Sequence, residues 1–291
     1  MISVIICTHN PLKTYLTRTL AALKKQTLAL QEWELILIDN ASQNPVAEQW
    51  DISWHPNARH VMEPELGLTA ARLRGIRESA GEVLVFVDDD NVLDSTYVRY
   101  VLEISNKWSI LGAWGGRIDP EFEIAPPEWT RNYWYLLVVR DVKKEVWGND
   151  NIANALPCGA GMCVRRQVAI QYEEALKIDS VRRALDRTGS SMGSCGDTDL
   201  ALTACDLGMG YGLFPFLQLT HLIPQERLSE EYLLKLYEGI ESSGKLMMER
   251  RGIAVNTSRP SLSKRVVDFL RYLRLNERER KFWKIRHRVQ N

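Results

Sequence analysis

Residues 83–90 read Val-Leu-Val-Phe-Val-Asp-Asp-Asp, and this stretch decides the fold of the 291-residue chain. An unbroken apolar run rich in valine is typical of a strand that is buried on both faces of a sheet. Three carboxylates that repel one another follow at the end of the strand, and folds usually neutralise such a cluster with a cation. Oxygen ligands favour Mg²⁺ or Mn²⁺. The alternative is a solvated acidic turn that caps a helix beginning near Asp94.

Strands and helices alternate through the first 110 residues. Strands are predicted at residues 2–7, 34–38, 59–62 and 82–87, and helices at residues 16–26, 68–79 and 96–107. Apolar strands separated by helices indicate a parallel sheet that is covered on both faces. Each strand is followed by polar residues, and ligands of such sheets bind at the carboxyl ends of the strands. We therefore expect one polar crevice at that edge.

The composition excludes several classes of protein. Basic and acidic side chains number 37 each, which argues against a general nucleic-acid binder. Five cysteines without a Cys-x-x-Cys pair indicate reduced thiols and argue against zinc. We expect no secretory signal at the N-terminus, and no stretch is apolar enough to span a membrane. We expect a cytoplasmic protein, either free or peripheral on the inner face of the membrane.

The middle of the chain, residues 111–166, is rich in aromatic residues and proline. Flat rings stack well on sugars, so these side chains either line an acceptor groove or belong to the core. Helices are predicted further on at 167–187 and 197–207, and a strand at 211–219. The loop between the two helices, 188–196, has the small-residue composition of a mobile segment.

The final segment, residues 229–291, has the pattern of helices. From Lys264 onward it carries eleven Lys, Arg or His residues, interleaved with apolar side chains. A basic amphipathic helix of this kind can lie on an anionic membrane surface. The alternative is a solvated helix that packs on the body of the protein or on a second subunit.

Two common nucleotide-binding motifs are absent from the sequence. The chain has no Gly-x-Gly-x-x-Gly after its first strand and no Gly-x-x-x-x-Gly-Lys-Ser/Thr, which excludes a Rossmann dehydrogenase and a P-loop enzyme. Asp39, at the end of the second strand, is placed to accept hydrogen bonds from a base or a ribose. As a single residue it is equally typical of a helix cap or an Asx-turn.

Four short segments occur in an order and at spacings that resemble a known family. They are Ile-Ile-Cys-Thr-His-Asn at 5–10, Ile-Leu-Ile-Asp-Asn-Ala-Ser at 36–42, Gly-Leu-Thr-Ala-Ala-Arg at 67–72 and Phe-Val-Asp-Asp-Asp at 86–90. Together they resemble the family-2 inverting glycosyltransferases of the GT-A fold. The resemblance covers roughly residues 1–225.

The resemblance implies an α/β fold with a single Rossmann-like mixed sheet flanked by helices. A glycosyltransferase domain would occupy residues 1–225, with a nucleotide-binding half at 1–110 and an acceptor half at 111–225. A helical C-terminal extension would follow at 226–291. The implied reaction moves a sugar from a nucleotide-diphosphate donor, UDP- or dTDP-linked, to a hydroxyl of a saccharide or lipid-linked acceptor. Mn²⁺ or Mg²⁺ would be the cofactor, and polysaccharide biosynthesis for the cell envelope is the common context.

The matching positions imply roles for residues of the donor site. Thr8 and Asn10 would lie along the nucleotide, with Asp39 on its base. Arg72 would approach the diphosphate or help to order the acidic motif. At the next position this chain has Leu73 where the family often has Asn, so one polar contact is missing.

The acidic motif and a histidine are implied to hold the metal. Asp88 would lie near the ribose or the metal, and Asp90 on the metal. Asp89 occupies the variable position of the family's Asp-x-Asp pattern, and strand alternation would turn it away from the ligand. His221 would be a third metal ligand or a phosphate contact, or otherwise a hydrogen-bonded structural residue. A neutral imidazole suits Mn²⁺ better than Mg²⁺.

The acceptor side needs a base that takes a proton from the attacking hydroxyl. Residues 196–200 resemble the family's Glu-Asp-x-Asp-Leu segment, which makes Asp197 the candidate base and Asp199 the fallback. The alternative for Asp197 is an N-cap of the following helix. Gly196 replaces the family's preceding acid. The small residues at 159–162 would form a wall, on a strand, where donor meets acceptor.

Two other functions remain open on the sequence alone. A nucleotidyltransferase would require a glycine-rich loop with Arg or Lys after the first strand, which residues 7–11 do not offer. A catalytically degenerate membrane-associated binding protein is suggested by the two departures at positions 73 and 196. Against it stand four carboxylates that are all present: Asp39, Asp88, Asp90 and Asp197. The sugar, the acceptor and the oligomeric state, including a homo-oligomer, are not specified by these patterns.

Overall fold

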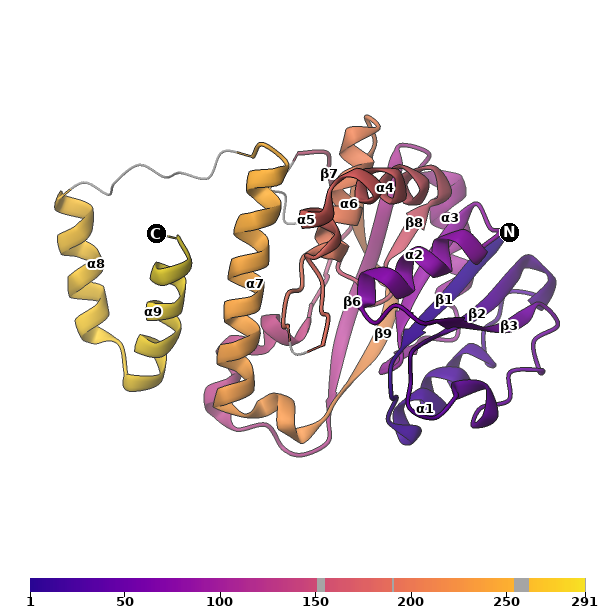
Figure 1. The fold of residues 1–291 in the computed structure, drawn as a ribbon, viewed down its shortest axis with the longest axis horizontal. Coiled ribbons are helices and arrows are strands. Elements are labelled where there is room, and N and C mark those ends of the chain that lie inside the picture. The colour runs from indigo at the N-terminus through magenta and orange to yellow at the C-terminus, as the bar shows by residue number, and fades with distance from the viewer. Residues whose placement is uncertain (151–154, 190, 254–261, 291) are drawn as a thin grey trace.

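The computed structural model describes residues 1–150, 155–189, 191–253 and 262–290. A mixed sheet runs through the centre of the molecule, in the strand order β3-β2-β1-β4-β8-β6-β9-β5 with β7 beside β9 (Figure 1). The first four strands are parallel to one another. They are β1 (Ile2–Thr8), β2 (Trp33–Asn40), β3 (Ala58–Glu63) and β4 (Val83–Asp88).

The second half of the sheet contains antiparallel pairs. Strand β8 is antiparallel to both β4 and β6, and β5 and β7 are antiparallel to β9, whereas β6 and β9 are parallel. The sheet is therefore mixed, and the purely parallel arrangement holds only for β1–β4. The bounds are β5 (Asn91–Leu93), β6 (Leu111–Phe122), β7 (Val146–Gly148), β8 (Cys163–Arg165) and β9 (Gly210–Ile223).

Helices cover both faces of the sheet, as the apolar strands predicted. The valines of β4 face a core formed with α1 and α3, whereas Leu84 and Phe86 face a second core formed with α2, α4 and α6. This alternation explains why the run at 83–87 is apolar at every position. The helices are α1 (Lys13–Leu23), α2 (Leu68–Glu78), α3 (Tyr97–Lys107), α4 (Arg166–Ile178), α5 (Ser180–Arg183) and α6 (Gly196–Asp206).

The acidic triplet does not cap a helix. Strand β5 follows it directly, and α3 begins only at Tyr97, with Thr96 as its N-cap. Asp94 instead accepts a hydrogen bond from the Thr96 amide at 2.9 Å. The alternative interpretation of the triplet as a capping turn is therefore wrong.

Most aromatic residues of the middle segment belong to the core. Trp114 is fully buried, and Tyr133, in the 3-10 helix η3 (Glu128–Leu137), stacks on Phe282 with ring centroids 4.0 Å apart. Tyr135 and Trp147 are exposed. All five cysteines are free thiols.

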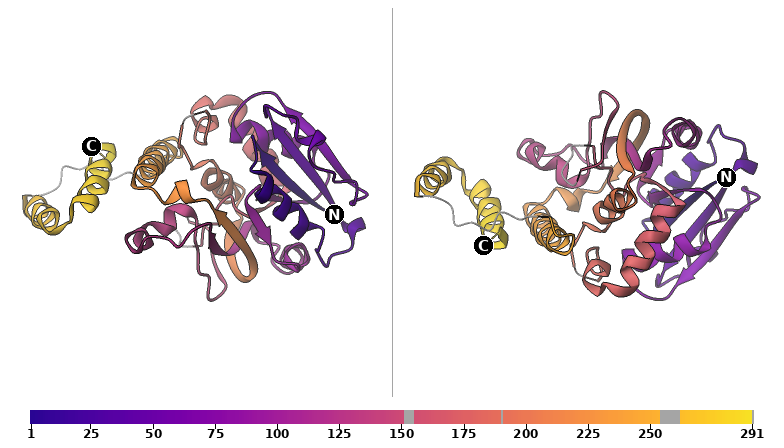
Figure 2. Two further views of the ribbon diagram at one scale, coloured as in Figure 1. Left: turned by 90° about the horizontal axis from the view of Figure 1, so that it is seen from below. Right: turned by 90° about the horizontal axis from the view of Figure 1, so that it is seen from above.

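Three helices follow the sheet: α7 (Glu230–Arg250), α8 (Leu262–Arg274) and α9 (Glu277–Gln290). Helix α9 packs on α7, where Arg278 and Lys281 both pair with Glu230. Further views show α8 and α9 side by side at the end of the molecule, beyond α7 (Figure 2). None of the described helices combines the length and the apolar character needed to cross a membrane.

Candidate functional site

A cavity of about 400 Å³ opens at the carboxyl ends of the parallel strands. The register brings these ends together, because Thr8 pairs with Asp39 and Cys7 with Asp88. Loops that precede α2 and α6 and that follow β9 complete the cavity wall. Among the lining residues are Thr8, His9, Asn40, Arg72, Asp88, Asp89, Asp90, Gly159, Ala160, Asp186, Arg187, Asp197, His221 and Arg227.

All three carboxylates of the acidic triplet line this cavity. The expectation that Asp89 turns away is wrong, because β4 ends at Asp88 and strand alternation ends with it. The Thr8 hydroxyl donates a hydrogen bond to Asp89. Burial and the charge of Asp90 nevertheless raise the pKa of Asp89 to about 7. Burial and the charge of Asp90 also raise the pKa of Asp88, because the carboxyl groups crowd one buried place.

Asp90 is placed beside two partners by the pairing of β5 with β9, in which Asn91 faces His221. Its Oδ2 lies 3.4 Å from Nε2 of His221 and 3.0 Å from Nη1 of Arg227. Arg227 comes from the 3-10 turn η4 (Gln225–Leu228) after β9. Burial would raise the pKa of Asp90, but His221 and Arg227 hold it well below its usual range.

The donor atoms at Asp90 fit a hard divalent cation that is shared with a substrate. Nδ1 of His221 lies 3.0 Å from the Leu137 carbonyl, which can only accept, so in the neutral ring Nε2 carries a lone pair. Nη1 of Arg227 lies 3.2 Å from this nitrogen and 3.0 Å from Oδ2 of Asp90. Within the described part of the chain, no three His, Cys, Asp or Glu side chains form a complete metal cage. Mg²⁺-type ions are usually held by one or two carboxylates together with substrate phosphates and water. Asp90 and His221 meet that requirement.

Asp197 faces the cavity from the first turn of α6. Its Oδ2 accepts the Gly159 amide at 2.6 Å and its Oδ1 accepts the Thr198 amide at 2.7 Å. Cys195 is the N-cap residue of this helix, so the N-cap alternative for Asp197 is wrong.

The small-residue wall is close to Asp197, but on a different element from the one predicted. Gly159 and Ala160 line the cavity from a turn that precedes β8, not from a strand. A Cβ atom on Gly159 would lie 2.5 Å from Nη2 of Arg72 and 3.3 Å from Oδ2 of Asp197. Only glycine fits where the backbone passes these two side chains.

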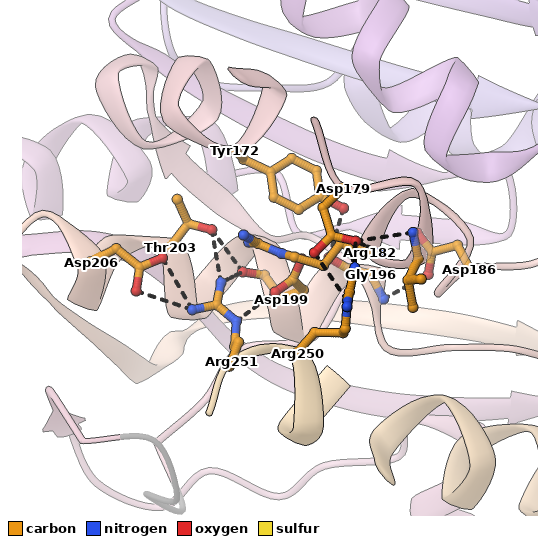
Figure 3. A network of polar contacts seen from close by, with 11 residues as sticks. Tyr172, Asp179, Arg182, Asp186, Gly196, Asp199, Thr203, Asp206, Arg250 and Arg251 are labelled. Carbon is orange, nitrogen blue, oxygen red and sulfur yellow. Dashed lines mark hydrogen bonds and ion pairs between the residues drawn. The ribbon is translucent and has the colours of Figure 1, made fainter. Parts of the chain in front are cut away.

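Asp199 is not brought to the cavity. Its side chain is 0% exposed, and its two oxygens accept Nε of Arg182 at 2.9 Å and Nε of Arg251 at 2.5 Å (Figure 3). Arg251 also forms an ion pair with Asp206, which lies on α6 like Asp199. The carboxylate is thus held in a buried ionic network behind α6, at the end of α7.

Two residues expected along the nucleotide shape a loop instead of lining the cavity. Asp39 accepts the amides of Ser42 at 3.0 Å and Val46 at 2.9 Å, which is the Asx-turn alternative. Asn10 is exposed in a left-handed conformation (φ 49°), and its Oδ1 accepts the Gln43 amide at 2.8 Å. Both residues hold the loop after β2.

Arg72 is buried in the cavity wall, on α2. Its Nη1 donates to Oδ2 of Asp186 at 2.8 Å. Burial would lower the pKa of Arg72, but the carboxylates of Asp186, Asp197 and Asp88 raise it above its ordinary value. The neighbouring Leu73 packs in the core beneath α2, so position 73 does not contribute a polar group to the cavity.

Three charged lining residues were assigned no role from the sequence: Asp186, Arg187 and Arg227. His9 and Asn40 lie two positions after predicted strands and were expected at the crevice only as polar residues there, without a role of their own. The Asn40 amide donates to the carbonyls of Glu63 and Glu65 and accepts the Gly67 amide, which ties β2 to the start of α2. Asp186, Arg187 and Arg227 lie in irregular connecting segments, where the pattern of apolar residues does not predict the position of a side chain.

The same chain matches known proteins in sequence and in fold. The sequence profile described as Glycosyl transferase family 2 matches residues 3–171. Glycosyltransferase AglE of Haloferax volcanii is 30% identical over 92 residues, which span 31% of this chain and 30% of that protein.

Solved structures of S. aureus TarS are similar in fold. The structure of TarS 1-349 with UDP has a TM-score of 0.54 at 15% identity, covering 83% of this chain and 64% of that one. The complex with UDP-GlcNAc has a TM-score of 0.55 at 14% identity, covering 97% and 78%. The architecture is the GT-A fold, as the sequence motifs predicted. Because the family profile matches more than half of the 291 residues, the chain belongs to glycosyl transferase family 2.

Proposed function

We propose that this chain is a metal-dependent inverting glycosyltransferase. It moves a sugar from a UDP- or dTDP-linked donor to a hydroxyl of a saccharide or lipid-linked acceptor in polysaccharide biosynthesis for the cell envelope. The observation that carries the proposal is that Asp90, His221, Arg72 and Asp197 all line one cavity. The complexes of TarS with UDP and with UDP-GlcNAc support the class of donor.

The donor diphosphate binds among guanidinium groups at the carboxyl ends of the strands. Arg72, Arg187 and Arg227 all line the cavity, and guanidinium groups bind phosphate oxygens in a bidentate manner. The cavity volume of about 400 Å³ lies within the usual range for small-molecule sites. Thr8, beside Asp89, borders the nucleotide, while Asp39 and Asn10 act through the loop after β2.

Asp90, His221 and Asp88 would hold the Mn²⁺ or Mg²⁺ ion. When bound, such an ion neutralises the charge that develops on the departing diphosphate. The chain itself already provides one cation at this point, since Arg227 pairs with Asp90 at 3.0 Å. This is one guanidinium beside three carboxylates that line the same cavity, which leaves room for a divalent ion to balance the triplet.

Asp197 acts as the general base. Its carboxylate accepts two backbone amides, and Oδ2, whose partner is the Gly159 amide, keeps a second lone pair for the acceptor hydroxyl. The hydroxyl oxygen attacks the anomeric carbon as the bond to the diphosphate breaks, and its proton moves to Asp197. Attack on the face opposite the leaving group inverts the configuration at that carbon.

A thermal-shift screen tests the donor site directly. Nucleoside diphosphates should raise the melting temperature in the presence of Mn²⁺, by roughly 5 °C at about 100 times the Kd. Asp90→Asn should remove the dependence on Mn²⁺, whereas Asp94→Asn, exposed and outside the cavity, should retain it.

Turnover then separates the three candidate functions. Release of nucleoside diphosphate from a panel of nucleotide sugars is expected with Mn²⁺. Release of pyrophosphate from nucleoside triphosphates would identify a nucleotidyltransferase instead. Binding of nucleotide without any turnover, with every candidate donor and acceptor, would identify a degenerate binding protein.

We also propose that α8 contacts an anionic membrane surface peripherally. An apolar row on this helix is exposed and is accompanied by Arg265, Arg271 and Arg274. Apolar side chains beside basic ones suit the boundary between acyl chains and acidic headgroups. The row consists of Val266, Val267, Phe269, Leu270 and Leu273.

Co-sedimentation with vesicles of phosphatidylglycerol tests this contact. The double variant Phe269→Asp/Leu273→Asp should lower the bound fraction at least about tenfold, because each charge opposes insertion and removes apolar area. Ile178→Asp, at an even more exposed apolar site at the end of α4, is the control and should bind normally. Unchanged sedimentation of the double variant together with loss of a dimer in light scattering would assign the row to a second copy of the chain.

A further inference from the structure

Asp186 is a buried carboxylate that belongs to none of the motifs in the sequence. It lies in the loop between α5 and α6, lines the cavity and is 3% exposed. Its Oδ2 accepts Nη1 of Arg72 at 2.8 Å and the Thr69 hydroxyl at 3.3 Å, and its Oδ1 accepts the Gly196 amide at 3.0 Å (Figure 3 shows Asp186 beside Gly196). Three donors from two elements give this carboxylate one orientation.

The Asp186 carboxylate fills the space in which a side chain at position 196 would begin. A Cβ atom on Gly196 would lie 2.2 Å from Oδ2 and 2.4 Å from Cγ of Asp186. Gly196 is the first residue of α6 and has no left-handed backbone angle, so its conformation does not require glycine. Glycine is also a poor helix former. The space taken by Asp186 is therefore the physical reason for glycine at this position.

Asp186 is connected to the candidate base by two short routes. The first is direct along the chain, because the Gly196 amide that it binds belongs to the residue before Asp197. The second passes through Arg72, whose guanidinium packs against the Gly159 backbone, and the Gly159 amide donates to Asp197 at 2.6 Å. Both the diphosphate-binding arginine and the base thus depend on where this carboxylate lies.

We propose that Asp186 is a positioning residue for sugar transfer, supplying from the preceding loop the carboxylate that position 196 lacks. It holds Arg72 on the donor side and fixes the first turn of α6, which carries Asp197. It also keeps Arg72 from pairing with Asp197, because a buried guanidinium without Asp186 would turn to the nearest remaining carboxylate. An Asp197 oxygen that accepts a guanidinium hydrogen bond has no lone pair left for the acceptor hydroxyl. This inference rests on the proposed function.

The effect of Asp186 should be visible in kcat more than in KM. Asp186→Asn keeps the size of the side chain and removes its charge, and kcat should fall about 100-fold, within the range of a misplaced base. The KM for the donor should rise by less than kcat falls, about tenfold at most, because Arg187 and Arg227 still line the cavity when Arg72 turns away. Gly196→Ala should have a similar effect, because its methyl group displaces the carboxylate. Asp179→Asn is the matched control, since Asp179 caps α5 nearby without lining the cavity.

Exchanging the two side chains distinguishes a positioning role from a merely structural one, because only a positioning carboxylate should restore kcat from the other position. Gly196→Glu alone should be inactive, and the double variant Asp186→Gly/Gly196→Glu should recover at least tenfold in kcat by returning a carboxylate to this point. Wild-type turnover of a nucleotide sugar comes first, and its absence would overturn the proposed function and not this assignment. With an active wild type, the assignment is overturned by unchanged kcat in Asp186→Asn or Gly196→Ala. It is equally overturned by a double variant that melts like the wild type yet remains as inactive as Gly196→Glu.

Discussion

Asp197→Asn is expected to lower kcat for sugar transfer by about 10³-fold, or about 4 kcal/mol of transition-state stabilisation. The carboxamide keeps the size of the side chain and one oxygen that can accept a backbone amide. It cannot take the proton of the attacking hydroxyl. Donor affinity should stay within about threefold, because a base acts on the acceptor and not on the nucleotide.

Single-turnover assays together with titration of nucleoside diphosphate measure these two quantities separately. Asp206→Asn, on the same helix but half exposed and outside the cavity, is the matched control and should retain wild-type kcat. Loss of donor binding in Asp197→Asn would reassign the residue to the donor site. Wild-type kcat would reject the role of Asp197 as a base.

Asp199→Asn should have the largest effect on stability of any single substitution in this region, about 3–5 kcal/mol. The carboxylate is 0% exposed, and its partner Arg251 is 6% exposed, so neither charge can be solvated in place. The neutral side-chain amide of Asn would accept only weakly from one of the two arginines, and its NH₂ group would face the guanidinium of the other. The melting temperature should fall by about 10 °C for a chain of this size.

Equilibrium unfolding in urea, with calorimetry, checks this expectation. Asp206→Asn again serves as the control, because Asp206 pairs with the same Arg251 but is 47% exposed. Its cost should be about 1 kcal/mol or less. Below its melting temperature, Asp199→Asn should turn over at close to the wild-type rate. A large loss of kcat without loss of stability would instead make Asp199 a catalytic residue.

The strands and helices that could be predicted are those in which buried apolar residues follow one another or recur at a regular spacing in the sequence. Strands β1–β4 and helices α1–α3 follow from apolar runs and helical spacing, with bounds that differ by a few residues. The position of the acidic triplet at the end of β4 follows from the same run. The family could also be identified from short motifs, since each of them is local in sequence.

The structure differs from the sequence-based expectation for two residues at or just after the end of a strand. Alternation predicted that Asp89 would turn away, yet it lies in a turn and faces the cavity. Asp39 was expected at the base of the nucleotide, but it does not line the cavity, and its oxygens accept the amides of Ser42 and Val46 in its own loop. The side chain of Asp39 is held by local hydrogen bonds, and that of Asp89 by a hydrogen bond from Thr8 on the neighbouring strand β1, so strand periodicity describes neither.

The sequence by itself determined a covered α/β sheet, an acidic strand end and membership of a glycosyltransferase family, because apolar periodicity and contiguous motifs need no knowledge of distant residues. Only the tertiary structure decided which carboxylates line the cavity. Asp197 and Asp199 are two positions apart on α6, and the helix turns one into the cavity and the other into a buried ion pair with Arg182 and Arg251. Asp186 meets Arg72 across 114 positions of the chain, a contact that exists only once the sheet and its helices have packed.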